Sequence, residues 1–250
     1  MFVNRMNIYK RILECRSKRI KQFAVLIDPD KQSKKCLIDI VKKGHEAKID
    51  FFFVGGSLIR KNNIDVCIDE IKRHSNIPVV LFPGSDMQIS EKADGILFLS
   101  LISGRNADMI IGRQVVAAPI LKNANIEILS TGYMLIDSGN MTTASYISNT
   151  RPIPHNKEDI AVCTAMAGEM LGMKIIYMDA GSGGKRPISK EMINTVAKDI
   201  DIPLIVGGGI DSPEKAELNC KAGADIIVVG NAIEKNNTLI KEISNAIHNI

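Results

Sequence analysis

The chain has 250 residues, of which 45% are hydrophobic, 24% are charged and 4% are aromatic. This balance is typical of a globular protein and excludes a disordered tail or a fibre. The net charge of +4 is mild and Trp is absent, which argues against a stacking surface for nucleic acid. No apolar run approaches the roughly 18 residues of a membrane span. Residues 1–22 also lack the apolar core of a signal peptide, so we expect a cytoplasmic protein.

The first 22 residues carry seven basic side chains among scattered apolar ones. They predict an extra N-terminal helix that packs on the rest of the domain, with its positive side chains on a solvated face. A role at a membrane surface is a secondary interpretation, because the segment has no Trp and no strong apolar face. We therefore expect at most a peripheral contact with membranes.

Eight short runs rich in Val, Ile and Phe predict strands that are apolar on both faces. They cover 23–28, 51–56, 78–84, 95–101, 126–131, 174–181, 203–209 and 225–231. Segments with helical periodicity separate most of them, namely 34–47, 64–74, 107–121, 158–171, 189–200, 213–222 and 239–247. Eight alternating units in 250 residues fit a (β/α)8 TIM barrel better than an open sheet, so we expect one α/β domain over 1–250.

The connection between the third and fourth strands is irregular. Residues 85–94 are too few for a covering helix with two turns, so the barrel is expected to lack its third outer helix or to carry a modified one. The gap would leave an apolar groove on the barrel wall. A short helix clipped by a tight loop is the alternative.

Glycine-rich turns end the seventh and eighth strands. Gly207, Gly208 and Gly209 follow one strand, and Gly230 and Asn231 follow the other. Glycines at these ends let backbone N–H groups approach an anion, which predicts a phosphate site in an α/β barrel. A run of glycines that only makes a tight turn is the alternative.

The sixth strand ends in a tyrosine, a carboxylate and a glycine-rich loop, Tyr177 to Gly184. Asp179 would repel a phosphate bound nearby, so it needs a second role. Accepting a proton from a substrate hydroxyl is such a role. Asp179 as a turn residue that bonds the glycine loop is the alternative.

The first and second strands end in groups that suit a hard cation. Asp28 supplies a carboxylate and Ser57 a hydroxyl, and Mg²⁺ takes only one or two protein oxygens together with substrate phosphates. Asp28 as a loop cap is the alternative.

At these strand ends the sequence resembles the geranylgeranylglyceryl phosphate synthase family, which includes the bacterial heptaprenylglyceryl phosphate synthases. The resemblance runs from about Phe23 to Ile233, and the motifs of the first and sixth strands together are specific. The motifs are Ile27-Asp28-Pro29-Asp30-Lys31, Val54-Gly55-Gly56-Ser57, Ser103-Gly104-Arg105-Asn106-Ala107-Asp108, Tyr177-Met178-Asp179-Ala180-Gly181-Ser182-Gly183, Gly207-Gly208-Gly209-Ile210 and Val229-Gly230-Asn231-Ala232.

The resemblance implies a TIM barrel with a modified third helix. It also implies a prenyltransferase that joins a polyprenyl diphosphate, with geranylgeranyl diphosphate as the expected donor, to the 3-hydroxyl of sn-glycerol 1-phosphate. The products are an ether lipid precursor and diphosphate, and the cofactor is Mg²⁺. A homo-oligomer is implied as well. By motif, Asp28 and Ser57 would hold Mg²⁺, and the glycerol 1-phosphate would contact Tyr177, Met178, Asp179, Ala180, Gly181, Ser182, Gly183, Gly208, Gly209, Gly230 and Asn231.

The chain departs from the family pattern at Asp179, where the family usually has Glu. The shorter side chain sets the carboxylate back by one methylene. Contact within about 3 Å then needs a shift of the backbone or the glycerol, or a bridging water. Two other interpretations compete: a sugar-phosphate isomerase or aldolase on the same barrel, although no strand end presents a Schiff-base lysine, and a relative that binds phosphate and lipid without catalysis.

Overall fold

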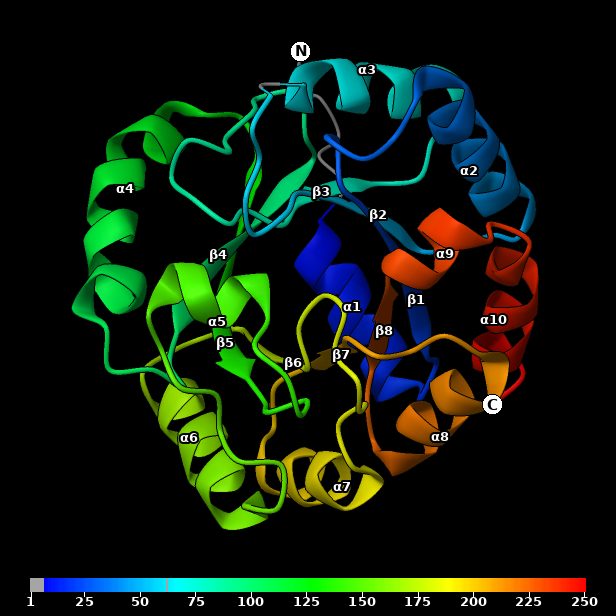
Figure 1. Ribbon diagram of the computed structural model, residues 1–250. Helices are drawn as coiled ribbons and strands as arrows, with labels where there is room; N and C mark the ends of the chain where they lie inside the picture. The colour runs from blue at the N-terminus through cyan, green and yellow to red at the C-terminus, as the bar shows by residue number, and fades with distance from the viewer. Residues whose placement is uncertain (1–6, 62) are drawn as a thin grey trace.

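The structure is a computed structural model that describes residues 7–61 and 63–250. Eight parallel strands form a closed barrel in which each strand pairs with the next, and β8 returns to β1 (Figure 1). The predicted TIM barrel is confirmed. The strands are β1 (Gln22–Ile27), β2 (Phe51–Val54), β3 (Val79–Leu81), β4 (Gly95–Leu101), β5 (Glu127–Leu135), β6 (Ile175–Asp179), β7 (Leu204–Gly207) and β8 (Ile226–Val229).

Helices surround the barrel, and their starts follow ordinary capping chemistry. Ser33, Ser189 and Ser212 each accept a hydrogen bond from the first turn of the helix that they precede. The described helices are α1 (Ile8–Ser17), α2 (Lys34–Glu46), α3 (Ile64–His74), η1 (Asp108–Gly112), α4 (Arg113–Asn123), α5 (Thr143–Ser148), α6 (Glu158–Met170), α7 (Lys190–Asp199), α8 (Pro213–Ala222), α9 (Asn231–Lys235) and α10 (Leu239–His248). None of them is long and apolar enough to cross a membrane.

The third outer helix is missing, as expected. Residues 82–94 run from β3 to β4 as turns and irregular backbone. The prediction differs from the structure elsewhere. The fifth strand continues to Leu135, four residues beyond the predicted end at Thr131, because its apolar run continues past Gly132. The short helix α5 has no counterpart in the prediction.

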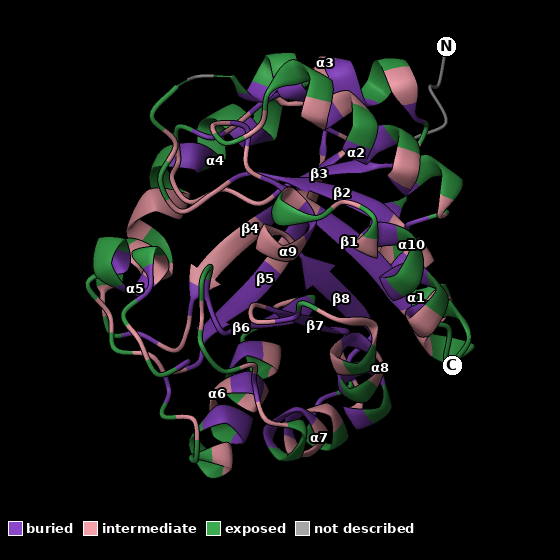
Figure 2. Cartoon of the chain, turned by 45° about the vertical axis from the view of Figure 1, so that its right-hand side comes forward, coloured by how far each residue is buried: buried purple, intermediate pink, exposed green. Residues whose placement is uncertain are grey.

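Two apolar cores result from the alternation of side chains along the strands. Phe51 and Phe53 of β2 belong to the core inside the barrel, whereas Phe52 between them packs with the surrounding helices. Figure 2 shows strands that are buried along most of their length, with the exposed residues on the outer faces of the helices. Every strand therefore reads as an apolar run, because both of its faces are covered.

The N-terminal helix closes the base of the barrel and is shorter than the predicted span 1–22. Helix α1 ends at Ser17 and β1 already includes Gln22, while residues 1–6 lie outside the described residues. Ile8 and Ile12 are buried with the side chains inside the barrel. The Glu127 carboxylate accepts hydrogen bonds from the backbone N–H groups of Ile8 (2.6 Å) and Tyr9 (3.0 Å).

Two arginines of this helix are not only solvated, as predicted, but also pair with carboxylates. Arg11 lies 2.7 Å from the Asp50 carboxylate, and Arg16 lies 3.2 Å from that of Asp225. Lys10, by contrast, is exposed. Asp50 and Asp225 directly precede β2 and β8, so the charges hold α1 against the amino ends of the strands. A one-dimensional pattern of charges does not show such partners.

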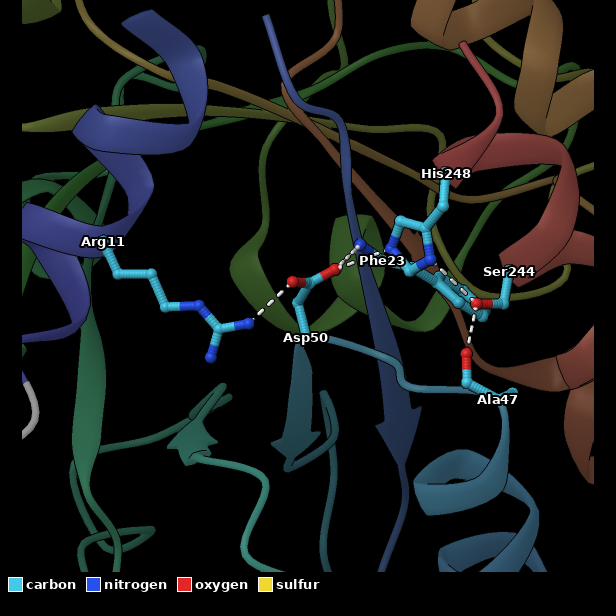
Figure 3. Close-up of polar contacts among 6 residues, drawn as sticks. All are labelled: Arg11, Phe23, Ala47, Asp50, Ser244 and His248. Atoms are coloured by element: carbon cyan, nitrogen blue, oxygen red, sulfur yellow. Dashed lines mark hydrogen bonds and ion pairs between the residues drawn. The ribbon is translucent and has the colours of Figure 1, made fainter. Parts of the chain in front are cut away.

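A polar network continues from Asp50 to the C-terminal helix (Figure 3). Asp50 accepts hydrogen bonds from the Phe23 N–H (2.9 Å) and from the ring Nε2 of His248 (3.0 Å). The Ser244 hydroxyl donates to the Ala47 carbonyl at 2.7 Å and lies 3.1 Å from the His248 Nδ1. The first and last described helices are thus joined through one carboxylate below β2.

Candidate active site at the barrel mouth

A cavity of about 620 Å³ opens at the carboxyl ends of the strands. It extends from the glycine loops after β6, β7 and β8 to the wall formed by β4, α4 and the connection after β3, where the third helix is missing. Most of the predicted site residues line it. They are Asp28, Ser57, Tyr177, Asp179, Gly181, Ser182, Gly183, Gly208, Gly209, Gly230 and Asn231.

Met178 and Ala180 are the two predicted contacts whose side chains lie elsewhere. Both are buried in the core between barrel and helices. They alternate with Tyr177 and Asp179 along β6, and neighbouring residues of a strand face opposite sides. Their backbone is what lies near the mouth: the Ala180 N–H donates to the Gly207 carbonyl at 3.0 Å.

Asp179 is buried at the floor of the mouth, and both of its carboxylate oxygens accept a hydrogen bond. The Tyr133 hydroxyl donates to Oδ2 at 2.5 Å, and the Gly181 N–H donates to Oδ1 at 2.7 Å. Burial raises the pKa of Asp179 above its usual value, while these two hydrogen bonds act in the opposite direction. The carboxylate is therefore held in one orientation and is more basic than an exposed aspartate.

Three aromatic rings surround this carboxylate on its barrel side. Phe82 stacks on Tyr177 with ring centres 5.0 Å apart, and Tyr133 meets both rings edge to face at 5.8 and 5.5 Å. Phe82 and Tyr133 were not among the predicted site residues. The apolar run that continues past Gly132 was the sequence signal that could have identified Tyr133. Because β5 extends through this run, Tyr133 pairs with Tyr177 in the β5–β6 register.

The loop after β7 needs glycine at position 208 for two physical reasons, its positive φ and the lack of space for a Cβ. Gly208 has φ +84°, and a Cβ there would lie 2.7 Å from the Asp179 Oδ1 and 2.8 Å from the Gly181 nitrogen. Across the mouth, the Asn231 amide donates to the Ser182 hydroxyl at 2.9 Å and so joins the loops after β6 and β8. The loops form a small polar cradle in which backbone comes close to backbone.

The predicted cation ligands lie on the other side of the mouth. Asp28 accepts from the Asp30 N–H at 3.0 Å, and its Oδ2 lies 3.1 Å from the ammonium of Lys31. Lys31 also lies 3.6 Å from a carboxylate oxygen of Glu234 on α9. Burial raises the pKa of Glu234. The positive charge of Lys31 lowers this pKa, and the Asp28 carboxylate raises it further.

The donor atoms present fit Mg²⁺. Asp28 and Ser57 both line the cavity and offer hard oxygen ligands, and Gly56 would place a Cβ only 3.2 Å from the Asp28 carboxylate. The described residues contain no cluster of three acidic or soft ligands. A Mg²⁺ ion that takes only Asp28 and Ser57 from the protein would be completed by substrate phosphates and water. Lys31 and Glu234 were not predicted, and Lys31 belongs to the same Asp-Pro-Asp-Lys motif as Asp28.

The wall of the cavity beyond Phe82 is largely apolar, although Arg113 and Gln114 of α4 also line it. Ile96 and Phe98 of β4 and Ala117 and Leu121 of α4 line it. These side chains would lie under a third outer helix in a regular barrel. The predicted apolar groove is therefore present where the helix is absent.

Comparisons with known proteins agree with this site. A family model described as the PcrB family matches residues 13–247. The chain belongs to the PcrB family. A geranylgeranylglyceryl phosphate synthase of Chitinophaga pinensis is 57% identical to this family member over 96% of each chain. One from Thermococcus kodakarensis is 43% identical and covers 87% of this chain and 86% of its own.

A solved structure extends the comparison to three dimensions. The crystal structure of (S)-3-O-geranylgeranylglyceryl phosphate synthase from Thermoplasma acidophilum, in complex with its substrate sn-glycerol-1-phosphate, has a TM-score of 0.92 and 32% identity. It covers 98% of this chain and 100% of its own. The resemblance predicted from the strand-end motifs of this PcrB family member is thus confirmed.

Proposed function

We propose that this chain transfers a prenyl group from a polyprenyl diphosphate, with geranylgeranyl diphosphate as the expected donor, to the 3-hydroxyl of sn-glycerol 1-phosphate. The observation that carries the proposal is one continuous cavity. It joins a polar mouth, with a buried carboxylate and glycine loops, to an apolar groove. An amphipathic donor and a small phosphorylated acceptor need this combination. The relatives named above act as geranylgeranylglyceryl phosphate synthases, which supports the same reaction here.

The acceptor would bind at the glycine loops. Backbone N–H groups after β6, β7 and β8 are free of side-chain bulk at Gly183, Gly208, Gly209 and Gly230, so a phosphate can approach them closely. The joined Ser182 and Asn231 would limit the size of the phosphate pocket. Asp179 is then near the glycerol part of the acceptor.

Asp179 would act as the general base. Its carboxylate takes the proton of the attacking hydroxyl while that oxygen forms the ether bond to the allylic carbon. The bond from this carbon to the diphosphate breaks, and the diphosphate leaves with the electron pair. Because Asp179 is already oriented by two hydrogen bonds, most of its contribution would come from positioning.

Asp28 and Ser57 would hold Mg²⁺ at the opposite rim. When bound, Mg²⁺ neutralises the negative charge on the departing diphosphate. The Lys31 ammonium group lies on the same side, between the carboxylates of Asp28 and Glu234, and can also face the diphosphate. The apolar wall at Ile96, Phe98, Ala117 and Leu121 would hold the prenyl chain and keep water from the reacting carbon.

The test is product formation with two acceptors. Purified protein with Mg²⁺ and geranylgeranyl diphosphate receives either sn-glycerol 1-phosphate or sn-glycerol 3-phosphate, and the ether product is detected by mass. Product from the 1-phosphate alone is expected, and a series of longer and shorter donors then gives the preferred chain length. If neither acceptor gives product with any donor, the proposed activity is wrong.

A further inference from the structure

A hydroxyl of the neighbouring strand holds the buried carboxylate of the site. Tyr133 on β5 is the register partner of Tyr177 on β6, and both side chains point into the barrel with Asp179. The Tyr133 hydroxyl reaches Asp179 Oδ2 at 2.5 Å, within the range of hydrogen bonds from a hydroxyl to a charged carboxylate. The Gly181 N–H occupies the other oxygen. The hydrogen bonds from Tyr133 and Gly181 together fix the orientation of the carboxylate.

The electrostatic surroundings make this hydrogen bond important for stabilising the negative charge of Asp179. Within the described residues, Asp179 makes no ion pair, so hydrogen bonds are what stabilise its negative charge. Burial raises the pKa of Asp179, and the Tyr133 hydroxyl is the largest effect that lowers it. Burial also raises the pKa of Tyr133 well above its ordinary value, and the charge of Asp179 adds to this. The proton between the two oxygens therefore stays on the tyrosine, which acts as the donor.

We propose that Tyr133 is a positioning residue that orients the Asp179 carboxylate and keeps it in the charged state that accepts a proton. This inference rests on the proposed function, in which Asp179 takes the proton of the acceptor hydroxyl. In that step the substrate proton moves to Asp179, and Tyr133 keeps its own proton throughout. The ring of Tyr133 is also held edge to face by Phe82 and Tyr177, which fixes its hydroxyl.

The position of Tyr133 explains how a carboxylate at this depth remains usable. Asp179 is one methylene shorter than glutamate and is only 8% exposed. A short, buried acid without a donor would be neutral over a wide pH range and unable to take a proton. The tyrosine hydroxyl supplies the missing stabilisation from inside the barrel, and it leaves the side toward the cavity to the substrate.

The experiment is Tyr133→Phe, which removes one oxygen and leaves the ring in its aromatic cluster. We expect kcat at neutral pH to fall about 10- to 100-fold, the range for losing a hydrogen bond to a charged group. The KM for sn-glycerol 1-phosphate should change less than about threefold, because the glycine loops are untouched. The acidic limb of the kcat profile should move to higher pH, so that activity partly recovers in alkaline buffer.

Two comparisons separate positioning from a structural role. Tyr146→Phe removes the same oxygen from a 71% exposed tyrosine on α5 and should leave rate and pH profile unchanged. In an Asp179→Asn background, Tyr133→Phe should cost almost nothing further, whereas independent damage to the fold would add. An unshifted pH profile in Tyr133→Phe, or full additivity with Asp179→Asn, would overturn the role of Tyr133.

A measurement on the unmodified chain keeps the test valid if the variant is unstable. The Tyr133 hydroxyl proton should give a strongly downfield proton resonance that is absent from Asp179→Asn, and its absence from the wild type would contradict the hydrogen bond. Failure of the proposed function is distinguishable: the wild type would then make no ether from either acceptor. A wild type that makes product, with a Tyr133→Phe variant equal to it, contradicts the role of Tyr133 alone.

Discussion

At the scale of single residues, the site depends on side chains whose neighbours come from other strands. Asp179 is basic because it is buried, and it is oriented because Tyr133 and Gly181 bond its two oxygens. Asp28 lines the cavity, and the Lys31 ammonium lies 3.1 Å from one of its carboxylate oxygens. Each group therefore has a distinct part in the proposed reaction, and each can be tested by one substitution.

Asp179→Asn should lower kcat about 10²- to 10⁴-fold, the usual contribution of a general base. Affinity for sn-glycerol 1-phosphate should remain close to that of the wild type, because the glycine loops hold the phosphate. Steady-state kinetics and a separate binding titration measure the two effects. An unchanged turnover number would remove Asp179 from the reaction.

Asp28→Ala should abolish the binding of a divalent cation together with most of the activity. The matched variant Lys31→Met should act in the opposite direction and tighten cation binding about two- to fivefold, because it removes the competitor for a partly exposed carboxylate. Titration with Mn²⁺ in the presence of diphosphate, followed by electron paramagnetic resonance with Mg²⁺ as competitor, measures both effects without turnover. Unaltered cation affinity in Asp28→Ala would contradict the metal assignment.

At the scale of elements, the missing helix after β3 and the network under β2 have the largest consequences. Without an outer helix after β3, the apolar face of β4 is covered by α4 only in part, which leaves the groove. At the other end of the barrel, the Asp50 carboxylate accepts hydrogen bonds from Arg11 of α1, the Phe23 N–H of β1 and His248 of α10. One end of the barrel is thus open to substrate and the other is closed by packing and charge.

If the prenyl chain binds in the groove, a substitution on α4 that fills the groove should change which donor length the enzyme prefers. Ala117 is buried in the groove wall, and Ala117→Phe would fill space that a long prenyl chain needs. We expect activity with long donors to be lost and activity with a short donor to persist. Ala118→Phe, at the next and exposed position, is the control. Equal use of all donors by Ala117→Phe would show that the chain binds elsewhere.

The Asp50 network predicts a pH-dependent contribution to stability. Burial alone would raise the pKa of Asp50, but hydrogen bonds from His248 and the Phe23 N–H and the charges of His248 and Arg11 lower it overall. A lowered pKa stabilises the folded state above the unfolded value of about 3.9, and this contribution is lost as the pH falls through the folded value.

Asp50→Asn should accordingly reduce the free energy of unfolding by about 3 kcal/mol at neutral pH, and the difference from wild type should shrink below about pH 4. Urea unfolding across this pH range measures it. Asp69→Asn, which breaks the exposed pair with Lys92, should cost less than about 1 kcal/mol. A difference for Asp50→Asn that stays constant down to the lowest pH would contradict the network.

At the scale of the whole molecule, the barrel separates stability from chemistry. The base holds α1 with ion pairs and α10 with the hydrogen bond between His248 and Asp50, while the mouth contains the strand ends and their loops. Beside the mouth, η1 and α4 expose four apolar side chains, Ile111, Val115, Val116 and Ile120, each more than half exposed. A helix that is apolar on its outer face usually meets a partner.

We expect this face to contact a second copy of the chain in a homo-oligomer. Changing Val115 and Val116 together to Asp should then release monomers, which light scattering after gel filtration detects. Leu218→Asp, at an apolar position on α8 that is 50% exposed, is the control and should leave the mass unchanged. A wild type that is already monomeric would contradict the expectation.

Much of the fold and part of the site followed from the sequence, because barrel strands are short, local and apolar on both faces. The alternation of such runs with helical segments predicted the barrel, and the short stretch 85–94 predicted the missing helix. The strand-end motifs predicted the residues at the mouth, since parallel strands bring their carboxyl ends together. Local patterns suffice for features that depend on spacing along the chain.

The tertiary structure alone decided which groups face each other across strands. Tyr133 bonds Asp179 over 46 residues of sequence, and Lys31 reaches Glu234 over about two hundred. Arg11 and Arg16 pair with carboxylates below the barrel. Met178 and Ala180 lie in the predicted motif, yet their side chains face the helices. Such pairings depend on strand register, on the alternation of side chains and on closure of the barrel. Closure places β8 beside β1, and a local sequence pattern does not predict this contact.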